Sequence, residues 1–411
     1  MDQDLAAAFS LLSADAVRSR AHTMLALGLE DRLPHFRVDI GRLDDAANLV
    51  IATTKAAYPG LVVPFHSRWR HFIVNGEDRY AVLDRTAGLP DRIAKARAAF
   101  DLAIVSVLLD AGTGPAWRFC DPATGAVLGR SEGLALASLD MFGRGVFSAR
   151  RTDPLRADAA RLIALTTEDL GKGFQFTQQN RFSGLAARTA LLNALGECAA
   201  KNPDVFARND TARPGGLFDY FVSIASDGTL PASTILSVLL RHFGSIWPSR
   251  LELGGVPLGD CWRHPALTTS DATSGFVPLH KLSQWLAYSL IEPLQQAGIV
   301  VTDIDGLTGL AEYRNGGLFV DTGVLVLRNP EDALREHDVA SPLVVEWRAL
   351  TVALLDRLAG AVRNKLNMTP AALPLASVLE GGSWAAGRAL AYKNRMDGAS
   401  PIKVVSDGTV F

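Results

Sequence analysis

The sequence has 411 residues, 48% of them hydrophobic, which is enough apolar surface for a substantial buried core. It carries 41 Lys and Arg residues against 43 Asp and Glu residues, so the formal net charge is -2. Because there is neither a basic excess nor a basic run, we expect no nucleic-acid partner. No window approaches the ~20 unbroken apolar residues of a membrane span, so we expect no membrane partner either.

The N-terminus and the cysteines favour a cytoplasmic location. The chain begins acidic and becomes amphipathic, whereas a secretory signal begins basic and continues as an apolar run. Cys120, Cys198 and Cys261 are too few and too scattered for a disulfide framework. Cys261 and His264, even with His280, lack a fourth residue at metal-like spacing. We therefore expect no metal and no other cofactor.

The first 150 residues are expected to mix helix and strand. An Asn75-Gly76 pair separates two alternating segments within residues 70–80, which is a strong signal for a β-hairpin. A second hairpin is expected across residues 117–128, where turn-forming residues separate two apolar stretches. Between the two hairpins, residues 89–111 have the apolar spacing of a buried helix. This part of the chain therefore predicts a small antiparallel β element.

From about residue 150 onward the pattern is mainly helical. Asp153 is the expected N-cap, and Pro154 the first residue, of a helix that continues to Gly171. Further helices are expected over residues 183–200, 232–243, 279–297, 342–366 and 375–392. No long linker separates residues 1–150 from residues 151–411, so the sequence predicts one integrated domain. Its expected class is α+β with a predominance of α-helix.

The helix expected over residues 278–297 carries more than an apolar stripe. A different face holds polar side chains, namely Lys281, Gln284, Tyr288 and Glu292. That face either lines a cleft or simply meets solvent. Trp285 favours the cleft, since a large aromatic side chain beside polar ones is typical of a half-buried pocket wall.

Residues 303–323 combine four carboxylates with five glycines. Glycine lets backbone approach a ligand closely, and a carboxylate stabilises the positive charge that develops on a sugar as its C–N bond breaks. Glu312 is the preferred carboxylate, and the alternative is a surface ion pair between Glu312 and Arg314. The run 315–317 (NGG) suits a hairpin turn, so the secondary structure of residues 300–328 is left open.

A basic segment near residue 66 is a further candidate. His66, Arg68 and Arg70 alternate along the chain and would share one face of an extended segment. They would then contact a phosphate or carboxylate, or else form an exposed basic edge strand that deters aggregation.

Six segments carry a resemblance to known proteins. They are residues 67–72 (SRWRHF), 128–142 (LGRSEGLALASLDMF), 279–294 (LHKLSQWLAYSLIEPL), 307–325 (LTGLAEYRNGGLFVDTGVL), 379–388 (LEGGSWAAGR) and the terminal SDGTVF. From near residue 60 to the C-terminus, the chain resembles a family of bacterial and fungal proteins linked to uracil catabolism. In that route the pyrimidine ring is opened on its ribose, and the ribosylated urea that remains must lose its sugar.

Four short motifs carry a second resemblance. They are H-K-x-x-Q at 280–284, A-E-Y-R at 311–314, V-E-W-R at 345–348 and L-E at 379–380, ahead of Trp384. Their order is similar to that in the queuosine-salvage glycosylases, which cleave a base from a ribose 5'-phosphate and share a helix-hairpin-helix DNA-glycosylase-like fold. The resemblance implies such a helical core, with Glu312 in place of the catalytic aspartate and Lys281 as a phosphate ligand. The chain departs from that family at Glu312, where the family has Asp, and at Ala385, where it has another acid.

The resulting prediction is a metal-independent N-ribosyl hydrolase whose partner is a small ribosyl compound, a ribosylurea and preferably its 5'-phosphate. The expected catalytic residues are Glu312 and Glu380. The expected substrate- and phosphate-binding residues are Lys281, Arg314, His280, Gln284, Trp285, Tyr288, Tyr313, Arg68 and Arg70. Two alternatives stay open. One is a ureido-amide hydrolase or phosphoribosyltransferase, and the other is a nucleotide-binding partner of the ring-opening enzyme without turnover of its own.

Overall fold

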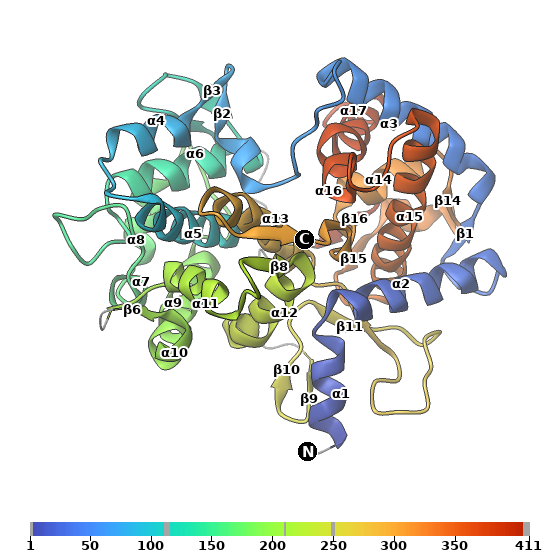
Figure 1. The fold of residues 1–411 in the computed structure, drawn as a ribbon. Helices are drawn as coiled ribbons and strands as arrows, with labels where there is room; N and C mark the ends of the chain where they lie inside the picture. The colour runs from blue at the N-terminus through green and yellow to red at the C-terminus, as the bar shows by residue number, and fades with distance from the viewer. Residues whose placement is uncertain (1–2, 111–115, 209–210, 248–250, 406–411) are drawn as a thin grey trace.

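The computed structural model describes residues 3–110, 116–208, 211–247 and 251–405. Most of the secondary structure is α-helical (Figure 1). The longer helices are α1 (Gln3–Leu11), α2 (Ala14–Leu29), α3 (Leu43–Ala57), α4 (Arg79–Thr86), α5 (Arg92–Leu108), α6 (Arg130–Gly143), α9 (Leu185–Lys201), α11 (Leu217–Ile224), α12 (Ala232–Phe243), α13 (Lys281–Gln296), α14 (Tyr313–Asp321), α15 (Pro342–Leu366) and α17 (Trp384–Asn394). The shorter ones are α7 (Ala159–Ile163), α8 (Thr167–Gly173), α10 (Pro203–Phe206) and α16 (Leu375–Val378). Tighter 3₁₀ turns are η1 (Ile40–Arg42), η2 (Arg68–Phe72), η3 (Pro214–Gly216), η4 (Gly244–Ile246), η5 (Ile304–Gly306) and η6 (Pro330–Leu334), and η7 (Leu379–Ser383) is a π-helical turn.

The strands of the described residues occur in two-stranded pairs. The antiparallel pairs are β1 (Phe36–Val38) with β14 (Leu325–Leu327), β2 (Ile73–Val74) with β3 (Glu77–Asp78), β4 (Phe119–Cys120) with β5 (Val127–Leu128), β6 (Ala207–Arg208) with β7 (Thr211–Ala212), β9 (Glu252–Leu253) with β10 (Val256–Pro257) and β11 (Cys261–Arg263) with β12 (Phe276–Pro278). The parallel pairs are β8 (Thr229–Pro231) with β13 (Val300–Thr302) and β15 (Glu336–Asp338) with β16 (Lys403–Val405). The predicted fold class, predominantly α with small β elements, is confirmed. The DNA-glycosylase-like character of the core stays a prediction.

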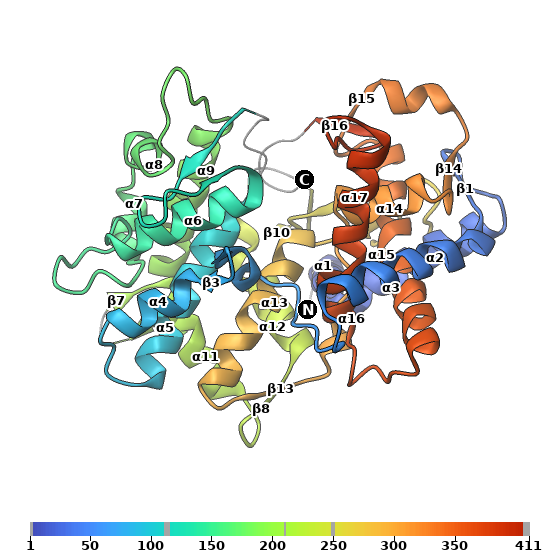
Figure 2. The same cartoon turned by 90° about the horizontal axis from the view of Figure 1, so that it is seen from above.

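Helix α13 lies between two groups of helices (Figure 1). On one side it packs against α5, α12 and η2. On the other side α2 and α3 pack on α15, and α3 also packs on η7, so these two N-terminal helices join the C-terminal helices. Figure 2 shows the same arrangement from above. The helical groups therefore do not follow the two sequence halves, and the single-domain organisation stays a prediction.

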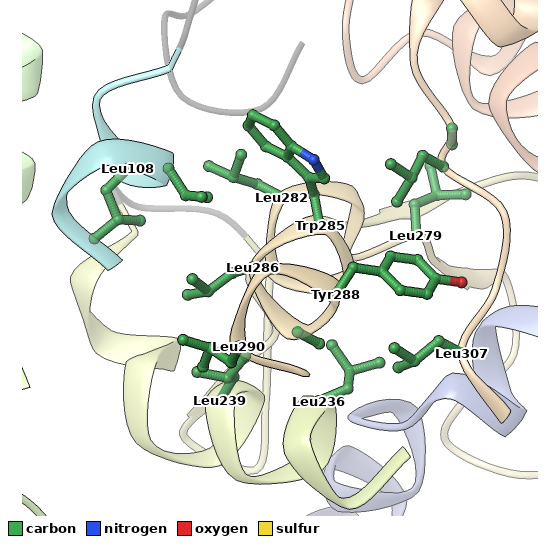
Figure 3. Packing of buried hydrophobic residues seen from close by; sticks show 14 of the residues in the cluster. Leu108, Leu236, Leu239, Leu279, Leu282, Trp285, Leu286, Tyr288, Leu290 and Leu307 are labelled. Carbon is green, nitrogen blue, oxygen red and sulfur yellow. The ribbon is translucent and has the colours of Figure 1, made fainter. Parts of the chain in front are cut away.

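Helix α13 is buried on almost every side. Figure 3 shows Leu282, Leu286 and Leu290 packed among apolar side chains, with Tyr288 directed toward Leu307. A helix that is apolar or enclosed all round belongs to the core of a protein. Helix α13 is therefore a fixed internal support, and its N-terminal part carries Lys281 and Trp285.

Several predicted elements are confirmed. Strands β2 and β3 form the hairpin expected at Asn75-Gly76, and both turn residues have positive φ (51° and 83°) as a tight hairpin turn requires. Strands β4 and β5 form the second hairpin. Helices α12 and α15 have the bounds expected from the sequence.

The prediction of a helix that begins at Asp153 is wrong. Asp153 binds the guanidinium of Arg156 (2.7 Å), and Arg156 also binds Asp158 (2.7 Å), so this stretch is held by local ion pairs in a non-helical form. Helix α7 begins only at Ala159, after Asp158, and ends at Ile163. A capping box at Thr166 then starts the separate helix α8.

The stretch left open at residues 300–328 contains a strand on either side of helix α14. The glycine run expected to suit a turn lies inside this helix. A side chain at Gly316 would begin 2.8 Å from the Trp347 ring, so glycine is what lets α15 approach the backbone of α14. Asn315 is fully buried, and it donates to Leu310 O (3.2 Å) and accepts from Ser383 Oγ (2.8 Å). Tertiary contacts therefore decide in favour of the helix.

Helices of the described segments are too short or too polar to cross a membrane. The terminal SDGTVF, which contributed to the sequence resemblance, lies outside the described residues.

Candidate functional site

The buried ion pair between Arg348 and Asp260 links the segments that carry Lys281 and Glu312. Asp260 Oδ2 accepts a hydrogen bond from the Lys281 backbone N–H at the start of α13 (2.8 Å). Arg348 donates to both carboxylate oxygens of Asp260 (2.8 Å each), and its Nε donates to the carbonyl of Ala311 (3.2 Å). Both side chains of the pair are almost fully buried. The pair therefore fixes the first residue of α13 relative to the residue that precedes Glu312.

The other members of the V-E-W-R motif also hold the framework. Glu346 accepts from the backbone N–H of Phe36 (2.8 Å) and lies 3.2 Å from His264. Trp347 Nε1 donates to the carbonyl of Gly316 (3.1 Å), within α14. The side chains of this motif therefore hold together the segments around the candidate site.

Glu312 is the N-cap of α14. Its two carboxylate oxygens accept hydrogen bonds from the backbone N–H groups of Arg314 (2.8 Å) and Asn315 (2.5 Å). A carboxylate at this position is also stabilised by the positive end of the helix dipole. The side chain is thus held in one orientation, as a preorganised negative charge must be.

Lys281 is half-buried beside this carboxylate. Burial lowers the pKa of Lys281, and the Glu312 charge is the largest influence in the opposite direction. The two charges are therefore close enough to interact, and partial burial makes that interaction stronger than in bulk solvent.

Four buried polar atoms near this pair have no hydrogen-bond partner within the described chain. They are Arg68 Nη2, His71 Nδ1, Trp285 Nε1 and Arg314 Nη1. Buried polar atoms in folded proteins are nearly always satisfied, by protein, water or a ligand. This group is consistent with a site whose remaining hydrogen bonds are completed by a bound molecule.

Four aromatic rings lie in contact with one another in this region, and two of them carry unsatisfied atoms named above. His66, His71, Trp285 and Trp384, here called the aromatic cluster, lie with ring centroids 5.6 to 6.4 Å apart in five pairs. The Arg68 guanidinium lies 5.5 Å from the Trp285 ring. On the opposite side the Arg314 guanidinium lies 5.1 Å from the Trp384 ring, close enough for cation–π attraction. The aromatic cluster therefore connects η2, α13, α14 and α17 in one site.

The basic segment near residue 66 is not extended as expected, because residues 68–72 form the 3₁₀ turn η2. In such a turn residues three apart share a side, so Arg68 and His71 both approach Trp285. Arg68 is fully buried, donates to Ser106 Oγ (2.6 Å) and lies 3.2 Å from Asp110. Arg70 points elsewhere and forms an ion pair with Glu292.

Three of the predicted binding residues have structural contacts. Gln284 exchanges two hydrogen bonds with Thr308 (2.6 and 3.2 Å), and the Tyr288 hydroxyl donates to the Thr308 carbonyl (3.0 Å). His280 Nε2 donates to the Leu11 carbonyl (3.0 Å). The polar side chains predicted to share one face of the helix therefore contact different neighbouring segments. Those of His280, Gln284 and Tyr288 hold α13 in place, and Lys281 and Trp285 remain at the candidate site.

The other predicted residues lie around the aromatic cluster. Tyr313 is half-buried against the Arg314 guanidinium (5.0 Å), and burial raises the pKa of its hydroxyl. Glu380 accepts from His66 Nδ1 (2.6 Å).

The sequence pattern suggested His66 only as part of a basic segment that contacts a phosphate or carboxylate, and it did not indicate Trp384, His71 or Asp110. A signal for Trp384 and His71 was present, because His71 follows the two candidate arginines and Trp384 follows Glu380 in a motif already noted. Asp110 carried no signal, since it is the residue after a buried apolar helix.

A small pocket lies at the N-terminal end of α13. Its walls include Leu12, Trp247, Asp260, His280 and Ser283. Among the described residues there is no group of three or more His, Cys, Asp or Glu side chains placed to hold a metal ion.

The buried histidines predict acid sensitivity. Burial lowers the pKa of His280 and lowers that of His71 well below its ordinary value of 6.5. Both rings then stay neutral in the folded protein, whereas below about pH 6.5 they take up protons in the unfolded chain. The unfolded state thus binds more protons, and stability is expected to fall as the pH is lowered from about 6.5 toward 5, with each of the two histidines contributing to the slope.

Urea unfolding of wild type and His280→Asn over this pH range tests the expectation. Asn suits the left-handed backbone at this position (φ 48°). In the variant, the free energy of unfolding should fall less steeply with decreasing pH than in wild type, because one titrating histidine is missing. This holds whatever the stability of the variant at neutral pH. Equal slopes in the two proteins would contradict the assignment.

The chain matches a defined protein family. Residues 10–411 match the family described as "Protein of unknown function (DUF1688)". Protein urg3 of Schizosaccharomyces pombe is 39% identical over 410 residues, which cover 98% of each chain. Uracil catabolism protein 4 of Lachancea kluyveri is 34% identical over 409 residues, which cover 92% of each chain. These matches confirm the family resemblance seen in the sequence, whereas the likeness to queuosine-salvage glycosylases stays a prediction. The chain therefore belongs to the DUF1688 family.

Proposed function

We propose that this protein acts in uracil catabolism as an N-ribosyl hydrolase that converts a ribosylurea 5'-phosphate to urea and ribose 5-phosphate. The observation that carries the proposal is the pairing of a fixed carboxylate, Glu312, with a half-buried ammonium, Lys281, beside buried donors that have no partner in the described residues. The similarity to uracil catabolism protein 4 of Lachancea kluyveri supports the pathway.

The carboxylate suits the reaction. Cleavage of a ribosyl C–N bond places positive charge on the anomeric carbon in the transition state. A carboxylate already oriented by two backbone N–H groups stabilises that charge more than it stabilises the uncharged sugar of the substrate. The charge and the fixed orientation of Glu312 therefore support its assignment to this step.

The cations suit a phosphate at the far end of the sugar. Arg314 is buried and keeps one guanidinium nitrogen unsatisfied in the described residues, and Lys281 lies within the field of Glu312 nearby. A phosphate dianion would offset the desolvation of both cations. Its binding energy can then be used to orient the anomeric carbon.

The aromatic cluster suits the leaving group. A ureido group is planar and carries a carbonyl acceptor, and the Trp285 Nε1 and Arg68 Nη2 donors lie at one edge of the aromatic cluster. Planar groups pack well against indole rings. The leaving group would therefore occupy the η2 side of the site and the phosphate the α14 side.

A product assay tests the proposed function. Purified protein is incubated with ribosylurea 5'-phosphate, and urea, ammonia and ribose 5-phosphate are measured separately. Urea and ribose 5-phosphate in equal amounts are expected. Release of ammonia would indicate a ureido-amide hydrolase, and consumption of pyrophosphate would indicate phosphoribosyl transfer. Tight nucleotide binding with no product would indicate a binding partner without turnover.

Lys281→Met tests the phosphate site. The substitution removes the ammonium and keeps most of the side-chain volume, so we expect KM for the phosphorylated substrate to rise about 10- to 100-fold. The change for unphosphorylated ribosylurea should be small. Steady-state kinetics on both substrates measure the difference.

Lys365→Met is the matched control, since Lys365 pairs with Asp44 on the surface. It should leave both KM values unchanged. An equal loss on the two substrates in Lys281→Met would argue against a phosphate contact at this position.

A further inference from the structure

We propose that His66, oriented by Glu380, is the general acid that protonates the leaving nitrogen, so that the site divides its chemistry between Glu312 at the sugar and His66 at the leaving group. This inference rests on the proposed function. It assigns a catalytic role to a residue that the sequence indicated only as part of a basic segment, and it makes Glu380 a positioning residue.

The hydrogen bond to Glu380 fixes the imidazole. His66 is 4% exposed, and its Nδ1 lies 2.6 Å from Glu380 Oε2. A carboxylate only accepts, so Nδ1 carries the hydrogen and Nε2 is the atom that gains and loses a proton. Within the described residues Nε2 has no hydrogen-bond partner. The ring is therefore held from one side and available on the other, as a proton donor must be.

Glu380 is itself fixed by an unusual local structure. It lies in the π-helical turn η7, and such turns occur frequently at functional sites. The following Gly382 packs directly on α3, because an added side chain would begin 2.3 Å from Val50 Cγ1. Tyr58 also lies against Glu380, and burial followed by the Glu380 charge raises the pKa of Tyr58. The carboxylate is therefore supported by α3 and by the segment that follows it.

The imidazole lies on the leaving-group side of the site. The His66 ring stacks on Trp285 (6.2 Å, 28°), which follows Lys281 by one turn of α13. It also lies 6.0 Å from Trp384, whose ring faces Arg314 next to Glu312. Both tryptophans thus connect His66 with the residues around Glu312.

The charges around His66 come from three elements. Glu380 is the carboxylate in direct contact, from η7. From η2, His71 approaches the ring (6.4 Å), and Arg68 and Arg70 act electrostatically on His71. Arg388 of α17 also acts on His71, and it is paired with Glu132 (2.7 Å). Burial keeps His71 neutral, so His66 is the histidine of this cluster that has a carboxylate to stabilise its imidazolium.

The proposed step balances without a cofactor. The His66 imidazolium gives its Nε2 proton to the ribosylated nitrogen while the C1'–N bond breaks, and the bonding electrons stay on nitrogen. Urea leaves, and Glu312 stabilises the sugar cation. Water then adds to C1', and its proton passes to Nε2, which restores the imidazolium. One water is consumed, and one urea and one ribose phosphate are formed.

An activated leaving group separates this role from a structural one. Urea leaves as an anion only with difficulty, so its departure needs the acid, whereas 4-nitrophenolate leaves without protonation. We therefore compare ribosylurea 5'-phosphate with 4-nitrophenyl riboside 5'-phosphate. His66→Asn should lower kcat at least about 100-fold on the first substrate and less than about tenfold on the second.

Two further variants make the comparison specific. Glu312→Gln should lower kcat on both substrates, because the sugar cation forms in either reaction. His22→Asn is the matched control, because His22 and Asp356 form another histidine–carboxylate pair (2.9 Å) in which neither residue belongs to the proposed machinery. This control should retain wild-type kcat on both substrates.

A pH profile tests the role of Glu380. In Glu380→Gln the alkaline limb of kcat should move to lower pH, because an amide stabilises the imidazolium less than a carboxylate does. Should His66→Asn fail to fold, His66→Ala with added imidazole provides a second test. It should regain part of its rate on the urea substrate.

The outcomes separate the inference from the proposed function. Equal losses on both substrates in His66→Asn, or no loss on either, would overturn the role of His66 alone. Wild-type protein that cleaves neither substrate would overturn the proposed function and this inference with it.

Discussion

Glu312→Gln is expected to lower kcat about 1,000-fold, which corresponds to about 4 kcal/mol of lost transition-state stabilisation. Glutamine has nearly the same shape, but it is neutral. One of the two backbone N–H groups, of Arg314 or Asn315, would keep an acceptor in the amide oxygen, while the other would face the amide NH₂. The charge on which the reaction depends would be gone. KM should change much less than kcat, since the charge matters most in the transition state.

The loss of a helix cap must be separated from the loss of a catalytic charge. Asp91 is a matched control because it caps α5 through bonds to Ile93 N (2.9 Å) and Ala94 N (2.8 Å), at an exposed position. Asp91→Asn should cost about 1 kcal/mol of stability or less and leave kcat unchanged. Thermal unfolding and urea release are measured on both variants. A Glu312→Gln protein with full kcat would eliminate Glu312 as the catalytic carboxylate.

Arg348→Met is expected to reduce the free energy of unfolding by about 3 to 5 kcal/mol. The Asp260 carboxylate would stay buried without the guanidinium that donates to both of its oxygens. Methionine fills most of the space, so the cost is mainly the uncompensated charge. Because Asp260 also holds the Lys281 backbone, kcat should fall as well. Urea unfolding followed by circular dichroism measures the stability.

A second bidentate pair serves as the control. Arg395 donates to both oxygens of Asp321 (2.8 and 2.7 Å), but the arginine side chain is 25% exposed. Arg395→Met should cost about 1 kcal/mol or less. Combining Arg348→Met with Asp260→Leu should recover part of the lost stability, because the double variant no longer buries a lone charge. Equal destabilisation by Arg348→Met and Arg395→Met would show that burial of the pair has no special role.

The sequence predicted correctly the helices whose N-cap and C-terminal residues are marked by local signals. Helix α15 begins after Ser341, which accepts from Val344 N, and has Pro342 as its first residue, so the sequence marks this boundary by itself. The region after Asp153 carries the same signals, yet Arg156 takes both neighbouring carboxylates and the helix does not form there. A side chain's choice between capping a backbone and pairing with a cation depends on the folded surroundings, which a sequence pattern does not contain.

The candidate site was also only partly predictable, because local motifs are visible in a sequence and tertiary contacts are not. Glu312 and Lys281 stood out because each lies in a short motif, and Arg314 followed from its place beside Glu312. Periodicity placed Gln284 with Lys281, but it cannot tell which neighbour a buried helix face will meet, and Thr308 takes the Gln284 amide. His66 meets Glu380 only through tertiary folding, so no local pattern predicts their hydrogen bond.

The packing of α2 and α3 on α15 has a consequence for synthesis. Translation proceeds from the N-terminus, so these two helices leave the ribosome on the order of tens of seconds before α15 is made. Until then the faces that pack on α15 have no native partner, and the nascent chain exposes them to other proteins. We expect this polypeptide to depend on chaperones during its synthesis more than a chain whose neighbouring helices pack in the order in which they emerge.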